Sequence, residues 1–226
     1  QAGSVKKLKW DINFADILIK GRASRGNIVT KYAIKRIELK EKGISTLKPR
    51  KIWYDPIVHR LNTEGRGELL GSFKGEDRLL LISKDAIVKT VIPDLSLHFD
   101  PNLLIIEKWN PEKPISVIHY EGEKERYFVK RFLVENPNRE ELVISDHPKS
   151  QLLFVSTQWR PMAEVVFTKT GRERAENQIV NIEEFIAIKG IKAIGNQLST
   201  ERIKEIVPLE PLPYEEPQTV EEPNEE

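Results

Sequence analysis

The chain has 226 residues, 39% of them hydrophobic and 31% charged, which is the composition of a folded globular protein rather than a disordered one. It contains no cysteine, which excludes disulfides, cysteine-ligated zinc and a thiol nucleophile, and we expect a reducing, intracellular compartment. The formal net charge of +1 is unevenly spread, because residues 1–51 carry 14 basic and four acidic side chains, whereas residues 205–226 carry eight Glu and no Lys or Arg. A basic head predicts a polyanionic partner, and the alternative is a solvated lysine-rich face.

The hydropathy of the chain predicts no membrane-spanning helix. The longest aliphatic runs, such as residues 79–82, are far shorter than the ~20 residues of a membrane-spanning helix. No signal-peptide pattern opens the sequence. Since the chain begins at Gln1 rather than Met, we expect a fragment or a processed protein.

The first predicted element is a β-hairpin in the basic head. Residues 17–20 and 28–34 are rich in β-forming side chains and flank a Gly/Ser/Asn turn. In the second arm, Ile28, Tyr32 and Ile34 would share one face, and Lys31 and Lys35 would share the other. The pattern predicts that one face is buried and that the other presents cations.

Three more hairpins are predicted further along the chain. They join residues 78–82 to 86–91, 115–120 to 126–134, and 152–156 to 163–167. Their turns lie about 38 residues apart, a period typical of radially repeated β units. The only helical turns we expect are at residues 183–185 and 199–205. From Pro208 onward, Pro and Glu dominate and predict a disordered tail.

Several segments resemble the C-terminal domain of type IIA topoisomerase A subunits, most closely the topoisomerase IV or gyrase-like A subunit of Bacteroidetes-type bacteria. The matching segments, in chain order, are DINFADILIKGRASRGNIVTKY at 11–32, IWYD at 52–55, LNTEGRGELLG at 61–71, IEKWNPEKP at 106–114 and IKGIKAIG at 188–195. The resemblance covers roughly residues 8–212.

This resemblance implies an all-β fold of the β-pinwheel type, a propeller-like disc of four-stranded blades that exchange strands with their neighbours. We expect four to five blades over residues 1–207 and an acidic tail over residues 208–226. The implied function is to bind and bend duplex DNA and to present it for ATP-dependent strand passage. The expected location is the bacterial cytoplasm, at the nucleoid.

The same resemblance implies that the chemistry lies elsewhere in the enzyme. The catalytic Tyr, the DNA gate and the Mg²⁺ site would belong to the N-terminal part of the A subunit, and ATP would bind the B subunit. Both are expected partners, and we expect neither a catalytic residue nor a cofactor in this chain. One departure matters: the glycine-rich basic heptad Q-R-R-G-G-K-G of gyrase is absent from the sequence. Its absence favours a topoisomerase IV-like role over gyrase activity.

The candidate DNA-binding residues are cations on turns and on outward strand faces. They are Lys20, Arg22, Arg25, Lys31, Lys35, Arg36, Lys40, Lys42, Arg50, Lys51, Arg60, Arg66, Lys130, Arg131, Lys189 and Lys192. We expect them to contact the phosphate backbone rather than base edges, because a rim of hairpins offers no recognition helix.

Two alternatives remain open at this stage. The domain could be a protein-interaction β-propeller that does not bind DNA. Independently, the acidic tail could fold over the basic surface and compete with DNA, or could serve only to keep the protein soluble. The four dispersed His have no metal-site spacing, and Gly65-Arg66-Gly67 is more typical of a tight turn than of a phosphate cradle.

Overall fold

The computed structural model describes residues 9, 11–14, 17, 20–38, 49–168 and 176–214. The chain divides into two compact units, Gln1–Ile44 and Ser45–Glu226, which we call the N-terminal unit and the sheet unit. Lys40, Lys42 and the tail from residue 215 lie outside the described residues. None of the described helices is long and apolar enough to cross a membrane.

The hairpin predicted in the N-terminal unit is not formed by its described residues. Residues 20–38 contain turns but no strand, with the Ser24 amide donating to the Gly21 carbonyl at 2.9 Å. The face predicted to be buried is open to solvent, since Ile28 is 80% and Ile34 57% exposed. Residues 18 and 19 of the first predicted arm lie outside the described residues, and the second arm, which is described, forms no strand.

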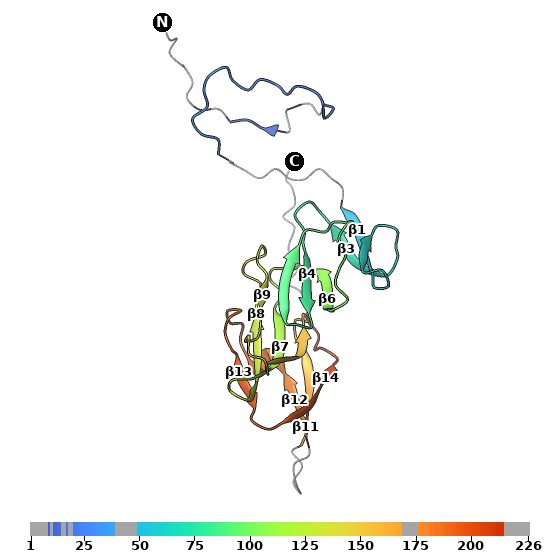
Figure 1. Ribbon diagram of the computed structural model, residues 1–226, viewed down its shortest axis with the longest axis vertical. Helices are drawn as coiled ribbons and strands as arrows, with labels where there is room; N and C mark the ends of the chain where they lie inside the picture. Colours follow the sequence, from blue (N-terminus) through green and yellow to red (C-terminus); the bar gives the residue numbers. More distant parts are fainter. Residues whose placement is uncertain are drawn as a thin grey trace. The chain divides into compact units, whose positions relative to one another are not determined.

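The sheet unit contains four antiparallel sheets (Figure 1). The first sheet has the order β2-β1-β3, built from Arg60–Asn62, Arg50–Asp55 and Glu68–Phe73. The second has the order β6-β4-β5-β9, built from Leu103–Lys108, Leu79–Ser83, Ile87–Val91 and Glu141–Leu142. The third has the order β10-β7-β8-β13, built from Gln151–Ser156, Ile115–Glu121, Arg126–Phe132 and Asn196–Ser199. The fourth has the order β12-β11-β14, built from Gln178–Asn181, Met162–Phe167 and Ile203–Leu209.

Two of the three later hairpins are confirmed and the last is wrong. β4 pairs with β5 across the turn at Ser83, and β7 pairs with β8 across the turn at Glu121. β10 and β11, in contrast, do not pair: β10 joins β7 in the third sheet, and β11 joins β12 and β14 in the fourth. The connection between them carries the chain from one sheet to the next.

Strands also return to an earlier sheet. β9 follows two strands of the third sheet but pairs with β5 of the second, and β13 follows two strands of the fourth but pairs with β8 of the third. The all-β, pinwheel-like fold with exchanged strands is therefore confirmed. Among the described residues, only the two middle sheets have the four strands expected of every blade.

Alternation along the strands explains how the sheets stack. In β4, all four of Leu79, Leu80, Leu81 and Ile82 are buried, because both faces of the second sheet are covered. Leu79 and Leu81 pack toward the first sheet, and Leu80 and Ile82 pack toward the third. A further core cluster joins the third sheet to the fourth. No core cluster formed by the described residues joins the fourth sheet to the first, so the series of sheets is open at both ends.

The end of the chain departs from prediction in two places. The helical turn expected near residue 184 is confirmed as α1, Ile182–Phe185, but the turn expected at 199–205 is wrong, because β13 ends at Ser199 and β14 begins at Ile203 with no helix between them. Pro208 and Leu209 belong to β14, where they pair with Ala163 and Met162. The folded chain therefore continues past the expected tail boundary at Pro208.

Candidate nucleic-acid interface

The N-terminal unit concentrates positive charge. Its described stretch 20–38 contains six cations and one acid, and all seven of these side chains are exposed. Arg36 pairs with Glu38. Among the described residues, Arg22, Arg25, Lys31 and Lys35 have neither an ion pair nor a side-chain hydrogen bond. Their charge is therefore available to an anionic partner.

A small loop presents two of these cations. The Lys20 Nζ atom donates to Asn27 Oδ1 at 3.1 Å, which links the two ends of residues 20–27. The turn from Gly21 to Ser24 lies inside this loop, so Arg22 and Arg25 sit at its exposed tip. Loops that hold cations in this way are suited to contact phosphates.

The first sheet carries three more exposed candidates on two faces. Arg50 shares its face of β1 with the buried Ile52, whereas Lys51 shares the opposite face with the half-buried Trp53. Arg60 lies opposite Asp55 in the register of β1 and β2, on the same face as Lys51. Lys51 and Arg60 thus belong to one face, and Arg50 belongs to the other.

Lys130 was wrongly predicted to lie on an outward strand face. It is only 4% exposed, because β8 lies in the middle of a sheet that is covered on both sides. Its Nζ atom donates to the Val143 carbonyl at 2.7 Å and the Ile191 carbonyl at 2.5 Å, and it lies over the Phe132 ring. Burial lowers its pKa to about 8. Lys130 therefore has a structural role, because it links the segments around Val143 and Ile191 to β8.

Arg131 was also wrongly predicted to face outward. It is 7% exposed and points to the opposite face of β8, where its Nη2 atom donates to the Trp159 carbonyl at 2.7 Å. Burial lowers the pKa of Arg131, and the charge of Glu183 opposes that shift. Neither Lys130 nor Arg131 can reach a nucleic acid without unfolding the third sheet.

The remaining candidates of the sheet unit are exposed but partly engaged. Arg66 pairs with Glu64 at 3.1 Å, and Lys189 donates to Asn196 Oδ1 at 2.8 Å. Exposed ion pairs of this kind are worth less than about 1 kcal/mol and break readily. Lys192 is exposed.

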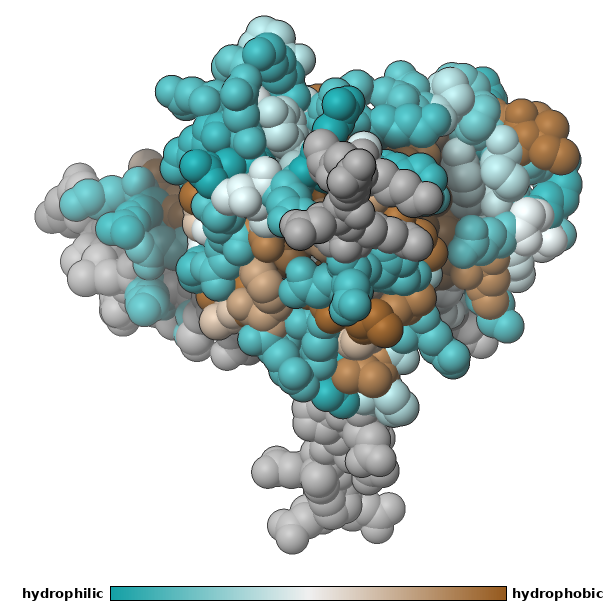
Figure 2. All heavy atoms as spheres, turned by 90° about the horizontal axis from the view of Figure 1, so that it is seen from below, coloured by the Kyte–Doolittle hydropathy of each residue, from teal (hydrophilic) through white to brown (hydrophobic). Residues whose placement is uncertain are grey.

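Six other cations of the sheet unit are compensated by nearby acids. The described ion pairs are Lys89–Glu140, Lys108–Asp77, Lys113–Glu107, Arg139–Glu141, Lys149–Glu125 and Arg160–Glu183. In the end-on view, hydrophilic side chains cover most of the visible surface and apolar ones form patches between them (Figure 2). These ion pairs reduce the free positive charge of the sheet unit, whereas the described stretch 20–38 has one ion pair for six cations.

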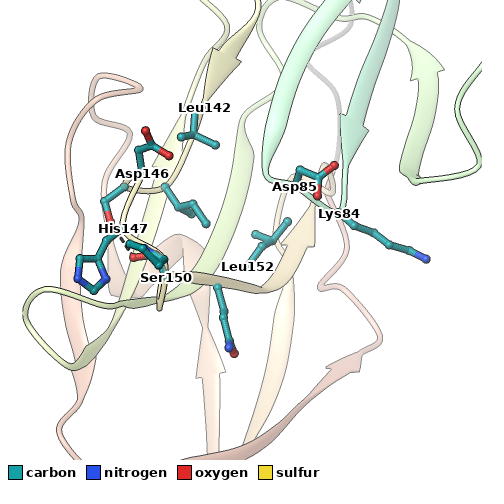
Figure 3. Close-up of a pocket in the computed structure, with 11 residues that line it drawn as sticks. Lys84, Asp85, Leu142, Asp146, His147, Ser150 and Leu152 are labelled. Carbon is teal, nitrogen blue, oxygen red and sulfur yellow. Dashed lines mark hydrogen bonds between the residues drawn. The ribbon is translucent and has the colours of Figure 1, made fainter.

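A hollow of about 500 Å³ lies at the junction of the second and third sheets (Figure 3). Lys84 and Asp85 at the β4–β5 turn lie across it from Asp146 and His147. Both acids disfavour an anionic ligand here.

Beside this hollow, the buried carboxylate of Glu121 is satisfied within the fold. It accepts hydrogen bonds from Ser145 Oγ at 2.5 Å and from the Glu123 amide at 3.4 Å. Burial raises the pKa of Glu121, but the hydrogen bonds outweigh burial and leave it lowered. This carboxylate therefore stabilises the turn between β7 and β8.

His119 lies in the core of the third sheet. His119 is buried, and its Nε2 atom lies 3.0 Å from the Ile194 carbonyl, so Nε2 must carry the proton that makes this hydrogen bond. Burial lowers the pKa of His119, which keeps the ring neutral. Within the described ranges, no three His, Asp or Glu side chains are grouped so that they could hold a metal ion.

Comparison with known families agrees with the topology. The family described as "Topoisomerase C-terminal domain, Bacteroidota" matches residues 1–42 and 60–210, which is most of the chain and includes both units. No curated protein matches the sequence.

Proposed function

Because the chain belongs to the topoisomerase C-terminal domain family of Bacteroidota, we propose that it binds and bends duplex DNA for a topoisomerase IV-like enzyme. In this role it holds one DNA segment and presents it to the rest of the enzyme. Strand passage, with its catalytic Tyr, Mg²⁺ and ATP, would be performed by the N-terminal part of the A subunit and by the B subunit. The enzyme would act at the nucleoid, in the cytoplasm.

The observation that carries this proposal is the set of uncompensated cations in residues 20–38. Duplex DNA has one negative charge per ~1.7 Å of its axis, so neutralising phosphates and releasing their counterions dominates affinity. The only described helix, α1, has four residues and cannot serve as a recognition helix. Binding should therefore depend on the phosphate backbone and vary little with sequence.

The energy needed to bend DNA is within reach of the proposed contacts. Smoothly bending a site by 40–90° costs on the order of 1–6 kcal/mol. Several charge-assisted phosphate contacts can offset that cost, because each is stronger than a neutral hydrogen bond. The absence of the gyrase-type heptad supports relaxation and decatenation rather than the introduction of negative supercoils.

Charge reversal at Lys31 and Lys35 tests the proposal. The double variant Lys31→Glu, Lys35→Glu should bind a duplex at least about tenfold more weakly in filter binding at 50 mM salt, because two phosphate contacts are lost. The control is Lys124→Glu, Lys149→Glu, which changes the net charge equally but lies in the sheet unit, at the β7–β8 turn and in the loop before β10. Equal affinity of both double variants would contradict the assignment of the interface.

A second candidate function is supported by the apolar side chains between those cations. Ile37 is 83% and Ile28 80% exposed in the N-terminal unit, and a contiguous patch of such side chains would mark a protein-interaction surface. A protein-binding module without DNA affinity would show no duplex binding even at 50 mM salt.

A further inference from the structure

A second hollow, of about 350 Å³, opens between the first and second sheets. Its walls include Arg50, Phe73, Lys74, Asp77, Ile92 and Pro93. Unlike the hollow in Figure 3, it combines two cationic side chains with an apolar floor. We call it the Arg50–Lys74 groove.

The sheet register brings the two cations together. Arg50 at the start of β1 lies opposite Phe73 at the end of β3, so the next residue, Lys74, leaves the sheet close to Arg50. A tight turn follows, in which the Lys74 amide donates to Asp77 Oδ2 at 2.8 Å and the Asp77 amide donates to the Lys74 carbonyl at 3.1 Å. This turn fixes the backbone from which the Lys74 side chain projects.

The one carboxylate in the wall is already neutralised. Lys108 Nζ lies 2.7 Å from Asp77 Oδ2 and also donates to the Ser72 carbonyl at 2.7 Å. Burial raises the pKa of Asp77, but its bonds to Lys108 and Lys74 outweigh burial and leave the pKa lowered, so the group stays ionised and paired. Among the described residues, Arg50 makes no side-chain hydrogen bond or ion pair. The Lys74 ammonium interacts electrostatically with Asp77, but the two side chains form no ion pair.

The surroundings suit one kind of ligand. A guanidinium presents paired N–H donors that match the oxygens of a phosphate, and a cleft with low-dielectric walls concentrates the field of its cations. Ile92, 58% exposed, and Pro93 offer an apolar surface beside the charges. A group with an anionic centre and an apolar flank, such as a phosphodiester with its sugar, fits this combination better than a free inorganic ion.

We propose that the Arg50–Lys74 groove holds a backbone phosphodiester of the bound duplex, with the adjoining sugar against Ile92 and Pro93. The inference rests on the proposed function and places a DNA contact at the junction of the first two sheets. Lys74 is a new candidate contact. Lys108 is a positioning residue, because it neutralises Asp77 beside the groove.

Neutral substitutions in the full chain test the groove. Arg50→Gln and Lys74→Gln should each weaken duplex binding by about tenfold in fluorescence anisotropy at 50 mM salt, and each should reduce the magnitude of the log–log salt slope by about one. The matched control is Lys84→Gln, an exposed lysine of the other hollow, which should bind as the parent does. Both groove residues are exposed, so circular dichroism should show the parent fold in every variant.

An amide-resolved NMR titration distinguishes the source of the phosphate. The duplex should shift the Gly75 and Ile92 amides at concentrations where inorganic phosphate leaves them in place. Saturating shifts with inorganic phosphate alone would overturn the assignment to DNA.

The outcomes separate the two proposals. If the parent chain binds DNA and Arg50→Gln and Lys74→Gln bind like Lys84→Gln, the groove proposal fails and the proposed function stands. If the parent chain does not bind DNA at all, the proposed function itself fails.

Discussion

Lys130 shows that a cation in a strand can be part of the core. It contacts carbonyls from two segments distant in sequence, Val143 and Ile191, and so ties both to β8. Its ammonium has no carboxylate partner among the described contacts, and burial lowers its pKa to about 8, from 10.5. The folded protein therefore releases this proton at a lower pH than the unfolded chain does.

We predict that the contribution of Lys130 to stability rises with pH above 8. Between pH 8 and 10.5 the unfolded chain binds more protons at this residue than the folded one, so its contribution to the unfolding free energy increases, by at most about 3 kcal/mol. Urea unfolding of the parent and Lys130→Met from pH 7 to 10 measures the difference. Parallel stability curves for the two proteins would contradict the lowered pKa.

Two glycines of the β2–β3 loop form a matched pair. Gly65 and Gly67 both have positive φ, 87° and 83°. An added Cβ at Gly65 would meet nothing within 4 Å, whereas one at Gly67 would collide with the Tyr54 carbonyl of β1. The motif Gly65-Arg66-Gly67 thus lies in a loop that brings its second glycine against β1.

We predict that Gly67→Ala destabilises the protein more than Gly65→Ala does. Gly65→Ala should cost about 1 kcal/mol for the left-handed backbone alone, and Gly67→Ala should cost at least about 2 kcal/mol more, because backbone must move. Thermal unfolding of both variants compares them directly. Equal melting temperatures would show that the approach of Gly67 to Tyr54 is looser than described.

Elements whose partners are close in sequence could be predicted, and those with distant partners could not. The β4–β5 and β7–β8 hairpins close through short turns, so local pattern and pairing coincide. β10 and β11 have the same local pattern, but their partners are β7 and β14. Which strand pairs with which is decided by sheet-to-sheet packing, and that packing leaves no mark in a short window of sequence.

The prediction of the candidate site was limited in the same way, because sheet-to-sheet packing decides which strand faces are exposed. Alternation indicates which residues share a face, but not whether a second sheet covers that face. Lys130 and Arg131 lie on opposite faces of β8, and both are buried because the third sheet has a neighbour on each side. Lys74 was missed for the converse reason. It lies outside any alternating strand, and only the register of β1 and β3 places it beside Arg50.

We predict that residues 210–214 stabilise the fourth sheet. The Leu212 amide donates to the Arg160 carbonyl at 3.0 Å, Arg160 Nη1 donates to the Pro213 carbonyl at 3.1 Å, and the rings of Trp159 and Tyr214 stack at 4.4 Å. Truncation after Leu209 should lower the unfolding free energy by about 1–3 kcal/mol. Truncation after Tyr214 should leave it unchanged, and equal loss in both truncations would contradict this docking.

Across the described chain, the excess of positive charge and the packed core lie in different units. The sheet unit is a series of packed sheets that pairs several of its cations with acids, whereas the described residues 20–38 carry six cations and one acid. The chain belongs to a family of topoisomerase C-terminal domains, and in the proposed function its unpaired cations bind the phosphates of DNA. Affinity should therefore follow the number of phosphates neutralised rather than base sequence.

The most direct test is an ionic-strength series of duplex binding by the full chain. We predict a straight log–log plot with a slope of about −0.9 per phosphate neutralised, corresponding to several phosphates, and similar affinities for duplexes of unrelated sequence. A slope near zero, or no binding at 50 mM salt, would contradict DNA binding through these cations.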